Sequence, residues 1–172
     1  MTSSSSGLVA YVWDTSSLLH VSIAGRLDVL GEFVKPSTQE SWEHCVTAAV
    51  AEELVTNGQS APDWASLVHV DGLNEIVAFG IWCQRLVGAD PHNRGEASVA
   101  AWAESHNAIA IVDDKDARIV MQRNGLTAHG SLWMLCQVIN CGRINVRTAS
   151  GFVDAVIMAG ARLPFNAGGF ED

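Results

Sequence analysis

Two apolar stretches of the 172-residue sequence each end abruptly at aspartate. Residues 8–13 lead into Asp14, and residues 108–112 lead into Asp113 and Asp114. Such runs are typical of strands buried on both faces of a parallel sheet, whose carboxyl ends share the edge where ligands bind. The alternative is that Asp14 and Asp114 only cap the helices that follow them. Two strands that end in the same way leave both interpretations open.

Two glutamates favour a shared site. Glu53 lies in a helical pattern, and Glu96 lies at the start of another helix. Both also have an ordinary interpretation, because carboxylates complement helix N-termini and only one of Glu52 and Glu53 need point inward. If Glu53 and Glu96 meet Asp14 and Asp114, their mutual repulsion requires a cation, and oxygen ligands suit Mg²⁺ or Mn²⁺. That arrangement is suited to metal-assisted phosphodiester hydrolysis.

The elements that would position these carboxylates alternate between strand and helix patterns, which predicts an α/β protein with a mainly parallel sheet. In the helix after Asp14 we expect Leu18, Leu19 and Ile23 to face the core. A later helix has Ile76, Val77, Phe79 and Ile81 available for packing. Strands are expected over residues 8–13, 44–46, 67–70 and 108–112, and further helices over 26–34, 48–55, 73–86, 96–105, 115–123, 131–140 and 148–160.

No repeat or long linker divides the sequence. We therefore expect one domain over residues 8–165, preceded by a flexible polar tail over 1–7 and followed by a C-terminal tail over 166–172. Residues 88–95 are the most loop-like part of the middle.

The composition is that of a folded but acidic protein. Hydrophobic residues make up 48% and charged residues 17%, which excludes intrinsic disorder. No apolar run approaches the ~18 residues of a membrane span, and residues 1–7 do not look like a signal peptide, so we expect a soluble cytoplasmic protein. The net charge of −9 argues against phosphate binding. However, residues 1–93 hold 11 acidic and 3 basic side chains, whereas residues 94–172 hold 8 and 7, so a polyanion would meet the second half.

Other reactive side chains show no recognisable pattern. The four cysteines lack zinc spacing and are expected to be buried, reduced thiols. The six histidines lack metal spacing as well, and a packed or solvated imidazole is the favoured interpretation even for His129. Of the six tryptophans, Trp13 is expected in the core, while the others could serve the core or an interface. Nucleotide-binding loops and a nucleophile elbow are absent from the sequence.

Four acidic motifs occur in the order and spacing of the PIN domain family, which the sequence resembles over roughly residues 8–165. They are VWDTS (12–16), VAEEL (50–54), GEA (95–97) and IVDDKDAR (111–118). HGS (129–131) and GRI (142–144) resemble the C-terminal pattern of the family. The sequence is most similar to compact prokaryotic PIN proteins, including VapC-type toxins of type II toxin–antitoxin pairs.

The resemblance implies a three-layer α/β/α sandwich and Mg²⁺- or Mn²⁺-dependent endoribonuclease activity. Carried over by position, the catalytic carboxylates would be Asp14, Glu53, Glu96 and Asp114. The metal ligands among them would be Asp14, Glu96 and Asp114, with Asp113 and Asp116 as further candidates. Thr15 and Ser131 match hydroxyl positions that could hold a water or a metal ligand, and Lys115, Arg118 and Arg123 could contact RNA phosphates. A homodimer and a small antitoxin are the partners that the resemblance implies.

Two departures from the family pattern stand out. Val112 occupies the usual threonine position before the final acidic pair, and the segment 39–44, which contains Trp42, is longer and more polar than expected. The alternatives to a toxin are a PIN nuclease of RNA maturation or decay and an inactive PIN-fold binding protein. If the four carboxylates share a site, the protein should bind RNA poorly without metal.

Overall fold

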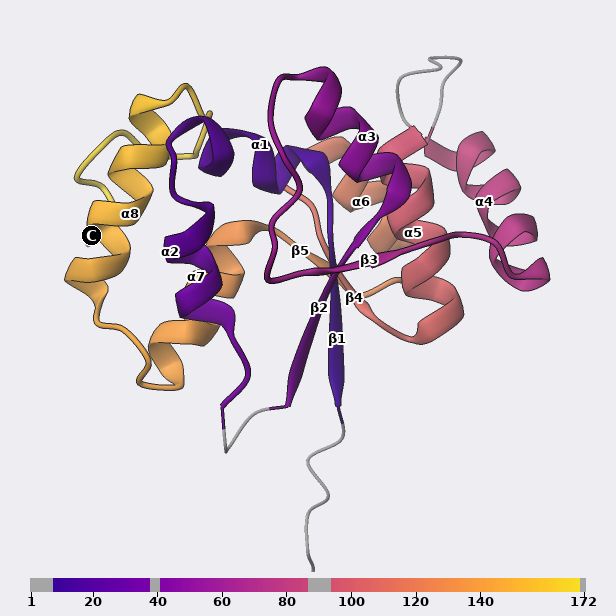
Figure 1. Ribbon diagram of the computed structural model, residues 1–172, viewed down its shortest axis with the longest axis horizontal. Helices are drawn as coiled ribbons and strands as arrows, with labels where there is room; N and C mark the ends of the chain where they lie inside the picture. The colour runs from indigo at the N-terminus through magenta and orange to yellow at the C-terminus, as the bar shows by residue number, and fades with distance from the viewer. Residues whose placement is uncertain (1–7, 38–40, 87–93, 171–172) are drawn as a thin grey trace, which may run out of the picture.

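The computed structural model describes residues 8–37, 41–86 and 94–170. Within these ranges, helices cover both faces of a five-stranded parallel sheet, so the protein is a three-layer α/β/α sandwich (Figure 1). The predicted fold class is confirmed. In chain order the elements are β1 (Val9–Trp13), α1 (Thr15–Ile23), α2 (Leu27–Val34), β2 (Trp42–Thr47), α3 (Ala48–Thr56), β3 (Ser66–Val68), α4 (Leu73–Leu86), α5 (Arg94–His106), β4 (Ile109–Ile111), α6 (Lys115–Arg123), β5 (Ala128–His129), α7 (Ser131–Asn140) and α8 (Val146–Met158).

The sheet has the strand order β3-β2-β1-β4-β5. Helices α1, α2, α7 and α8 lie on one face, and α3, α4, α5 and α6 lie on the other (Figure 1). Central strand β1 is covered from both sides, and its Val12 and Trp13 have no exposed surface, which explains the uninterrupted apolar run. Trp13 pairs with Val46 of β2 and Ile111 of β4. The residues that follow β1 and β4 therefore emerge side by side at the carboxyl edge.

Most predicted elements are present, and three helices have the predicted bounds: α4, α6 and α7. Helix α6 is followed by Gly125, whose φ of 89° stops the helix in the left-handed region that glycine tolerates. Strand β2 is longer than predicted, and β3 covers residues 66–68 instead of 67–70. The short strand β5 was not predicted at all. The N-terminal tail, residues 88–93 of the expected loop and residues 39–40 lie outside the described residues.

The expected packing of α4 is correct for Phe79, which packs against the core, and wrong for the other three side chains. Ile76, Val77 and Ile81 are 52%, 55% and 43% exposed, whereas Ala78 and Trp82 are buried. Helix α4 lies on the outside of the sandwich and packs mainly on α5. Only one narrow side of α4 is therefore buried. Phe79, Cys83 and Leu86 are partly buried against the core, whereas Leu73, Ile76, Val77 and Ile81 face solvent.

Two smaller expectations about burial also fail. Ile23 is 49% exposed because it lies at the last turn of α1, and Val21 is buried in its place. Burial was expected for the four cysteines, none of which forms a disulfide, but Cys136 and Cys141 are exposed because they lie on the outer side and at the end of α7.

Trp13 is part of the core, as predicted, and contacts a buried histidine. The Trp13 Nε1 donates a hydrogen bond to Nδ1 of His44 at 3.0 Å, and His44 Nε2 donates to the carbonyl of Val34 at 2.9 Å. Rings of Tyr11 and Trp64 also pack on the imidazole. Burial lowers the pKa of His44 to about 4, so the imidazole is neutral in the folded protein.

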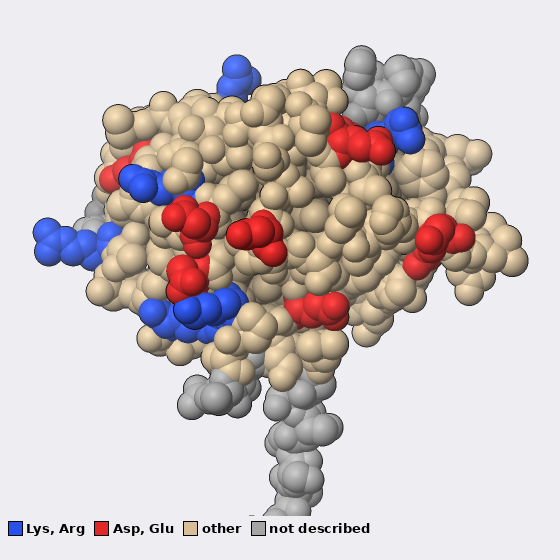
Figure 2. Space-filling model, viewed as in Figure 1, with Lys and Arg blue, Asp and Glu red and all other residues tan. Residues whose placement is uncertain are grey.

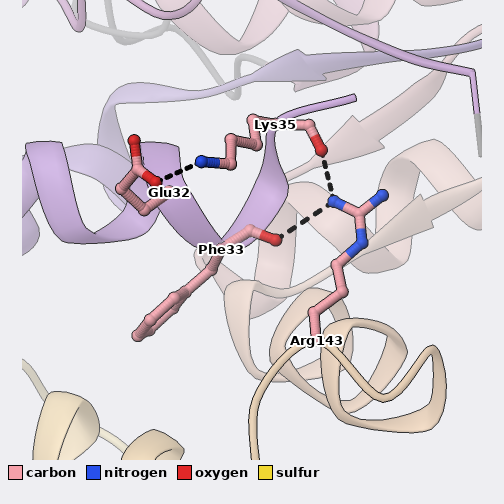
Figure 3. A network of polar contacts seen from close by, with 4 residues as sticks. All are labelled: Glu32, Phe33, Lys35 and Arg143. Carbon is pink, nitrogen blue, oxygen red and sulfur yellow. Dashed lines mark hydrogen bonds and ion pairs between the residues drawn. The ribbon is translucent and has the colours of Figure 1, made fainter. Parts of the chain in front are cut away.

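Arg143, just after α7, anchors the end of α2 (Figure 3). Its guanidinium donates to the carbonyls of Phe33 and Lys35, which α2 cannot satisfy by itself. The same guanidinium lies over the ring of Trp42, 4.1 Å from the centroid. Lys35 also pairs with Glu32, a solvent-exposed pair that contributes little to stability. Arg143 thereby ties α2, the start of β2 and α7 together.

None of the helices in the described ranges has the length and apolar composition of a bilayer-spanning segment.

Candidate active site

Four carboxylates meet at the carboxyl edge of the sheet. Asp14 follows β1 and Asp114 follows β4, the two strands that pair at the centre of the sheet. Glu53 is carried by α3, and Glu96 lies in the first turn of α5. The negative charges of Asp14, Glu53 and Asp114 all act on Glu96, and the charge of Glu53 also acts on Asp14. Glu96 therefore lies within electrostatic reach of the other three. We call Asp14, Glu53, Glu96 and Asp114 the acidic quartet.

Asp14 is the buried member of the acidic quartet, with 1% of its surface exposed. It caps α1: its Oδ2 accepts hydrogen bonds from the Ser16 amide at 2.9 Å and from the Ser16 hydroxyl at 2.5 Å. Its Oδ1 is buried and has no hydrogen-bond partner among the described residues. Burial raises the pKa of Asp14 to about 6, and the charge of Glu53 adds to this effect. Asp14 thus combines the capping role with a free, desolvated oxygen.

Glu53 is held in place by two donors. Its Oε1 accepts from the Gly95 amide at 2.8 Å, and its Oε2 accepts from the Thr15 hydroxyl at 2.5 Å. A Cβ at Gly95 would lie only 2.4 Å from Oε2, so this close approach requires glycine. The hydroxyl of Thr15 therefore orients a carboxylate. Sequence reasoning missed Gly95, although its position directly before Glu96 in the GEA motif was a signal.

Glu96 is half-buried, and the charges of the other three carboxylates act on it. Burial raises its pKa to about 7, and the charge of Asp14 is the next cause, followed among the charges by Glu53 and Asp114. A proton or a cation near Glu96 would relieve this repulsion.

Ser16 connects the two central strand ends. Its Oγ donates to Asp14 and accepts from the amides of Asp113 at 3.0 Å and Asp114 at 3.2 Å. The Asp114 Oδ1 accepts from the Ala117 amide at 2.8 Å and so caps α6. Asp114 thus caps a helix and also lies at the edge of the sheet where Asp14 lies. The D-x-S spacing was the only sequence signal for Ser16.

Asp113 points toward α7, unlike its neighbour. Its Oδ1 accepts from the Ser131 amide at 2.6 Å, and its Oδ2 accepts from the Ser131 hydroxyl at 2.7 Å. Burial raises the pKa of Asp113, and these hydrogen bonds oppose that effect. Both oxygens of Asp113 and the hydroxyl of Ser131 are therefore engaged in joining β4 to α7.

The candidate RNA contacts on α6 differ from one another. The guanidinium of Arg118 donates to the carbonyls of Val112 at 2.6 Å and Asp113 at 3.2 Å. Lys115 and Arg123 are exposed at opposite ends of α6, and Asp116 is exposed in its first turn. Outside this helix, His129 stacks on Trp133 with ring centroids 3.9 Å apart, in line with a packed imidazole.

The acidic quartet is chemically suited to a hard divalent cation. It offers only oxygen donors, and one buried oxygen of Asp14 has no partner among the described residues. Burial is the main cause of the raised pKa values of Asp14 and Glu96, and neighbouring negative charge, which a cation would offset, adds to it. In the described part of the chain, however, no three His, Cys, Asp or Glu side chains are already arranged around one point as metal ligands. Metal binding would require these side chains to move closer to one another.

Comparison with known families agrees with this geometry. A family model described as a PIN domain matches residues 10–166, which includes every member of the acidic quartet. No curated protein matches the chain. PIN domains are generally nucleases, hydrolases that act on RNA and generally use divalent metals. The chain belongs to the PIN domain family.

Proposed function

We propose that this PIN domain is a metal-dependent endoribonuclease whose site is the acidic quartet. The observation that carries the proposal is the buried Asp14 carboxylate, which has an oxygen without a partner among the described residues and lies within electrostatic reach of Glu53 and Glu96. A fold rarely retains so costly an arrangement without a ligand for it.

The chain's residues divide into two roles. Asp14, Glu96 and Asp114 would hold Mg²⁺ or Mn²⁺, because each has an oxygen that is not fixed by the rest of the fold. The bound ion would supply an activated water and offset charge on the phosphate. Glu53 has both oxygens engaged by Thr15 and Gly95, which orients it rigidly at the edge of the site.

Asp113 and Ser131 act as positioning residues in this proposal. Their paired hydrogen bonds set the start of α7 against the end of β4, next to Asp114. The exposed Asp116 remains a further candidate ligand.

RNA would reach the site without a large basic surface. On the face shown in Figure 2, basic side chains are scattered and most of the surface is neither acidic nor basic. Lys115 and Arg123 are exposed and would contact phosphates, whereas Arg118 is engaged with backbone carbonyls. Binding should therefore depend on a cation in the acidic quartet.

The resemblance to VapC-type proteins carries a finer proposal, a toxin that dimerises and is silenced by an antitoxin. The exposed apolar side chains of α4 would suit such a partner: Leu73, Ile76, Val77 and Ile81. Growth arrest on induction that Asp14→Asn abolishes would support the toxin, and arrest that persists would refute this mechanism of toxicity. Light scattering tests the dimer.

The decisive experiment measures RNA cleavage with and without Mn²⁺. We expect wild-type protein to cleave only with the ion, and Asp14→Asn and Glu96→Gln to lose roughly 100-fold in rate, equivalent to about 3 kcal/mol of transition-state stabilisation. Asp63→Asn, at an exposed loop position, is the matched control and should behave like wild type. No cleavage by wild type in any RNA, or full activity of both variants, would refute the proposal.

A further inference from the structure

A side pocket of about 280 Å³ opens at the same edge of the sheet as the acidic quartet. Its walls come from the ends of β2 and β3, the first turns of α3 and α5, and one side of α4 (Figure 1). The residues that matter for its chemistry are Thr47, Glu52, Asp71, Phe79, Arg94 and Ser98.

The side pocket and the acidic quartet share a wall. Arg94 directly precedes Gly95, whose amide binds Glu53. On the pocket side, Ser98 Oγ donates to the Gly95 carbonyl at 2.7 Å and lies 2.6 Å from the hydroxyl of Thr47. Thr47 and Ser98 are buried, so this wall is rigid. The side pocket is therefore adjacent to the acidic quartet across this wall.

The lining of the side pocket combines an apolar surface with hydrogen-bond acceptors. Phe79 is half-buried and contributes an aromatic ring. The carboxylates of Glu52 and Asp71 make no hydrogen bond or ion pair to another described side chain, so their acceptors are available. Arg94 is exposed at the rim and contributes a cation, and His69 is a further titratable residue of the lining. The volume is of the order of small-ligand sites, which start at about 300 Å³, and suits one nucleoside.

The charges decide which part of a nucleotide enters. Glu52 and Asp71 are exposed, like Arg94, so two carboxylates and one guanidinium lie at the mouth of the pocket. The two carboxylates together disfavour a phosphate beside them, and their oxygens can accept hydrogen bonds from the N–H groups of a base. Single-stranded RNA is read by stacking on aromatic side chains and by hydrogen bonds to exposed base edges. Guanine presents two neighbouring N–H donors on its Watson–Crick edge, whereas uracil presents one.

We propose that the side pocket binds the base of a nucleotide next to the scissile phosphate, with guanine favoured. The base packs on Phe79, Glu52 and Asp71 accept its N–H groups, and Arg94 meets the backbone phosphate at the rim. The proposal deepens the ribonuclease function and rests on it. It makes the side pocket the source of sequence preference, separate from the carboxylates that act on the phosphodiester.

The test is cleavage of single-stranded RNA in which each base is placed in turn at the positions that flank the cut. Phe79→Leu keeps most of the packing volume but removes the ring, and should raise KM about tenfold while kcat stays near wild type. Asp71→Asn should reduce the preference for guanine. The control for Phe79→Leu is Phe165→Leu, a ring that follows α8 in the chain, packs near Phe170 and does not line the side pocket.

Arg94→Gln should also raise KM, whereas Arg147→Gln, an exposed arginine in the first turn of α8, should not. Melting temperatures confirm that every variant is folded. If wild type cleaves RNA but Phe79→Leu, Asp71→Asn and Arg94→Gln retain its KM and base profile, the pocket assignment is wrong and the ribonuclease stands.

If wild type cleaves no RNA, the proposed function fails and binding of guanosine 5′-monophosphate decides on the pocket. Binding detected by NMR that is about tenfold weaker in Phe79→Leu than in Phe165→Leu would support the assignment. Absent binding, or equal binding by both variants, would overturn it.

Discussion

Gly95→Ala tests the contact on which the orientation of Glu53 depends. The new Cβ would lie 2.4 Å from Oε2 and 2.7 Å from Oε1 of Glu53, far inside van der Waals contact. These atoms end a flexible side chain, so the carboxylate should move while α5 stays in place. It would then lose its hydrogen bonds from the Gly95 amide and the Thr15 hydroxyl.

The size of the effect follows from those two hydrogen bonds. Hydrogen bonds to charged groups contribute about 1.5–3 kcal/mol each, but the half-buried carboxylate of Glu53 regains water when it moves. Replacing glycine by alanine within a helix stabilises the folded protein by about 0.5–1 kcal/mol, which offsets part of this loss. We expect the free energy of unfolding to fall by about 1–2 kcal/mol. If Glu53 acts in catalysis, the rate should fall by roughly 10- to 100-fold.

Denaturant unfolding and RNA cleavage measure the two effects. Gly80→Ala is the matched control, because it lies in helix α4 and its added Cβ would meet no described atom within 4 Å other than the neighbouring residues and backbone of its own helix. It should be neutral or slightly stabilising. In a Glu53→Ala background, Gly95→Ala should cost less than about 0.5 kcal/mol, because the atoms it displaces are gone. Gly95→Ala protein as stable and as active as Gly80→Ala, or equal costs in both backgrounds, would refute the reasoning.

Three further predictions concern burial and charge. The pKa of His44 is lowered from 6.5 to about 4, so its contribution to stability is present above pH 6.5 and is lost as pH falls toward 4, by up to about 3 kcal/mol. The raised pKa values of Asp14 and Glu96 have the opposite effect, because they make the fold more stable as pH falls. The loss of stability from His44 should therefore be measured by urea unfolding in an Asp14→Asn/Glu96→Gln background. A free energy of unfolding that does not change with pH in this background would contradict the prediction. The pKa of Glu96 is raised to about 7, so its ionisation destabilises the metal-free fold as pH rises above 4.5. In EDTA, Glu96→Gln should therefore stabilise the fold by about 1 kcal/mol at pH 8 and have no effect at pH 4. The gain at pH 8 is smaller than the full pKa shift implies, because the carboxylate is partly solvated. A change in melting temperature that is the same at both pH values would contradict this prediction. Ser131→Ala should cost about 1–2 kcal/mol because Asp113 loses a donor, whereas the exposed control Ser105→Ala should cost almost nothing.

The parts of the fold that were predicted correctly carry strong local signals. Helix α6 begins at the cap residue Asp114 and stops before Gly125, and both signals are visible in the sequence. The parts that failed depend on distant neighbours. Strand β5 has two residues and exists because it pairs with β4, and the exposed face of α4 follows from packing on α5. Periodicity showed that α4 is helical but not which of its apolar sides would be covered.

The sequence by itself determined that two buried strands end in aspartate and that two helices carry glutamates near them. It could not determine which oxygens face one another, because those contacts join residues far apart in the chain. Glu53 meets Gly95 across two elements, and Asp113 faces Ser131 while its neighbour Asp114 lies near Glu96. Adjacent residues after a strand diverge in direction, and only the packing of helices on the sheet decides what each one meets. The sequence therefore showed the four residues of the acidic quartet and their order. Only the tertiary structure shows the buried Oδ1 of Asp14, without a partner among the described residues, and the contact of Glu53 with Gly95.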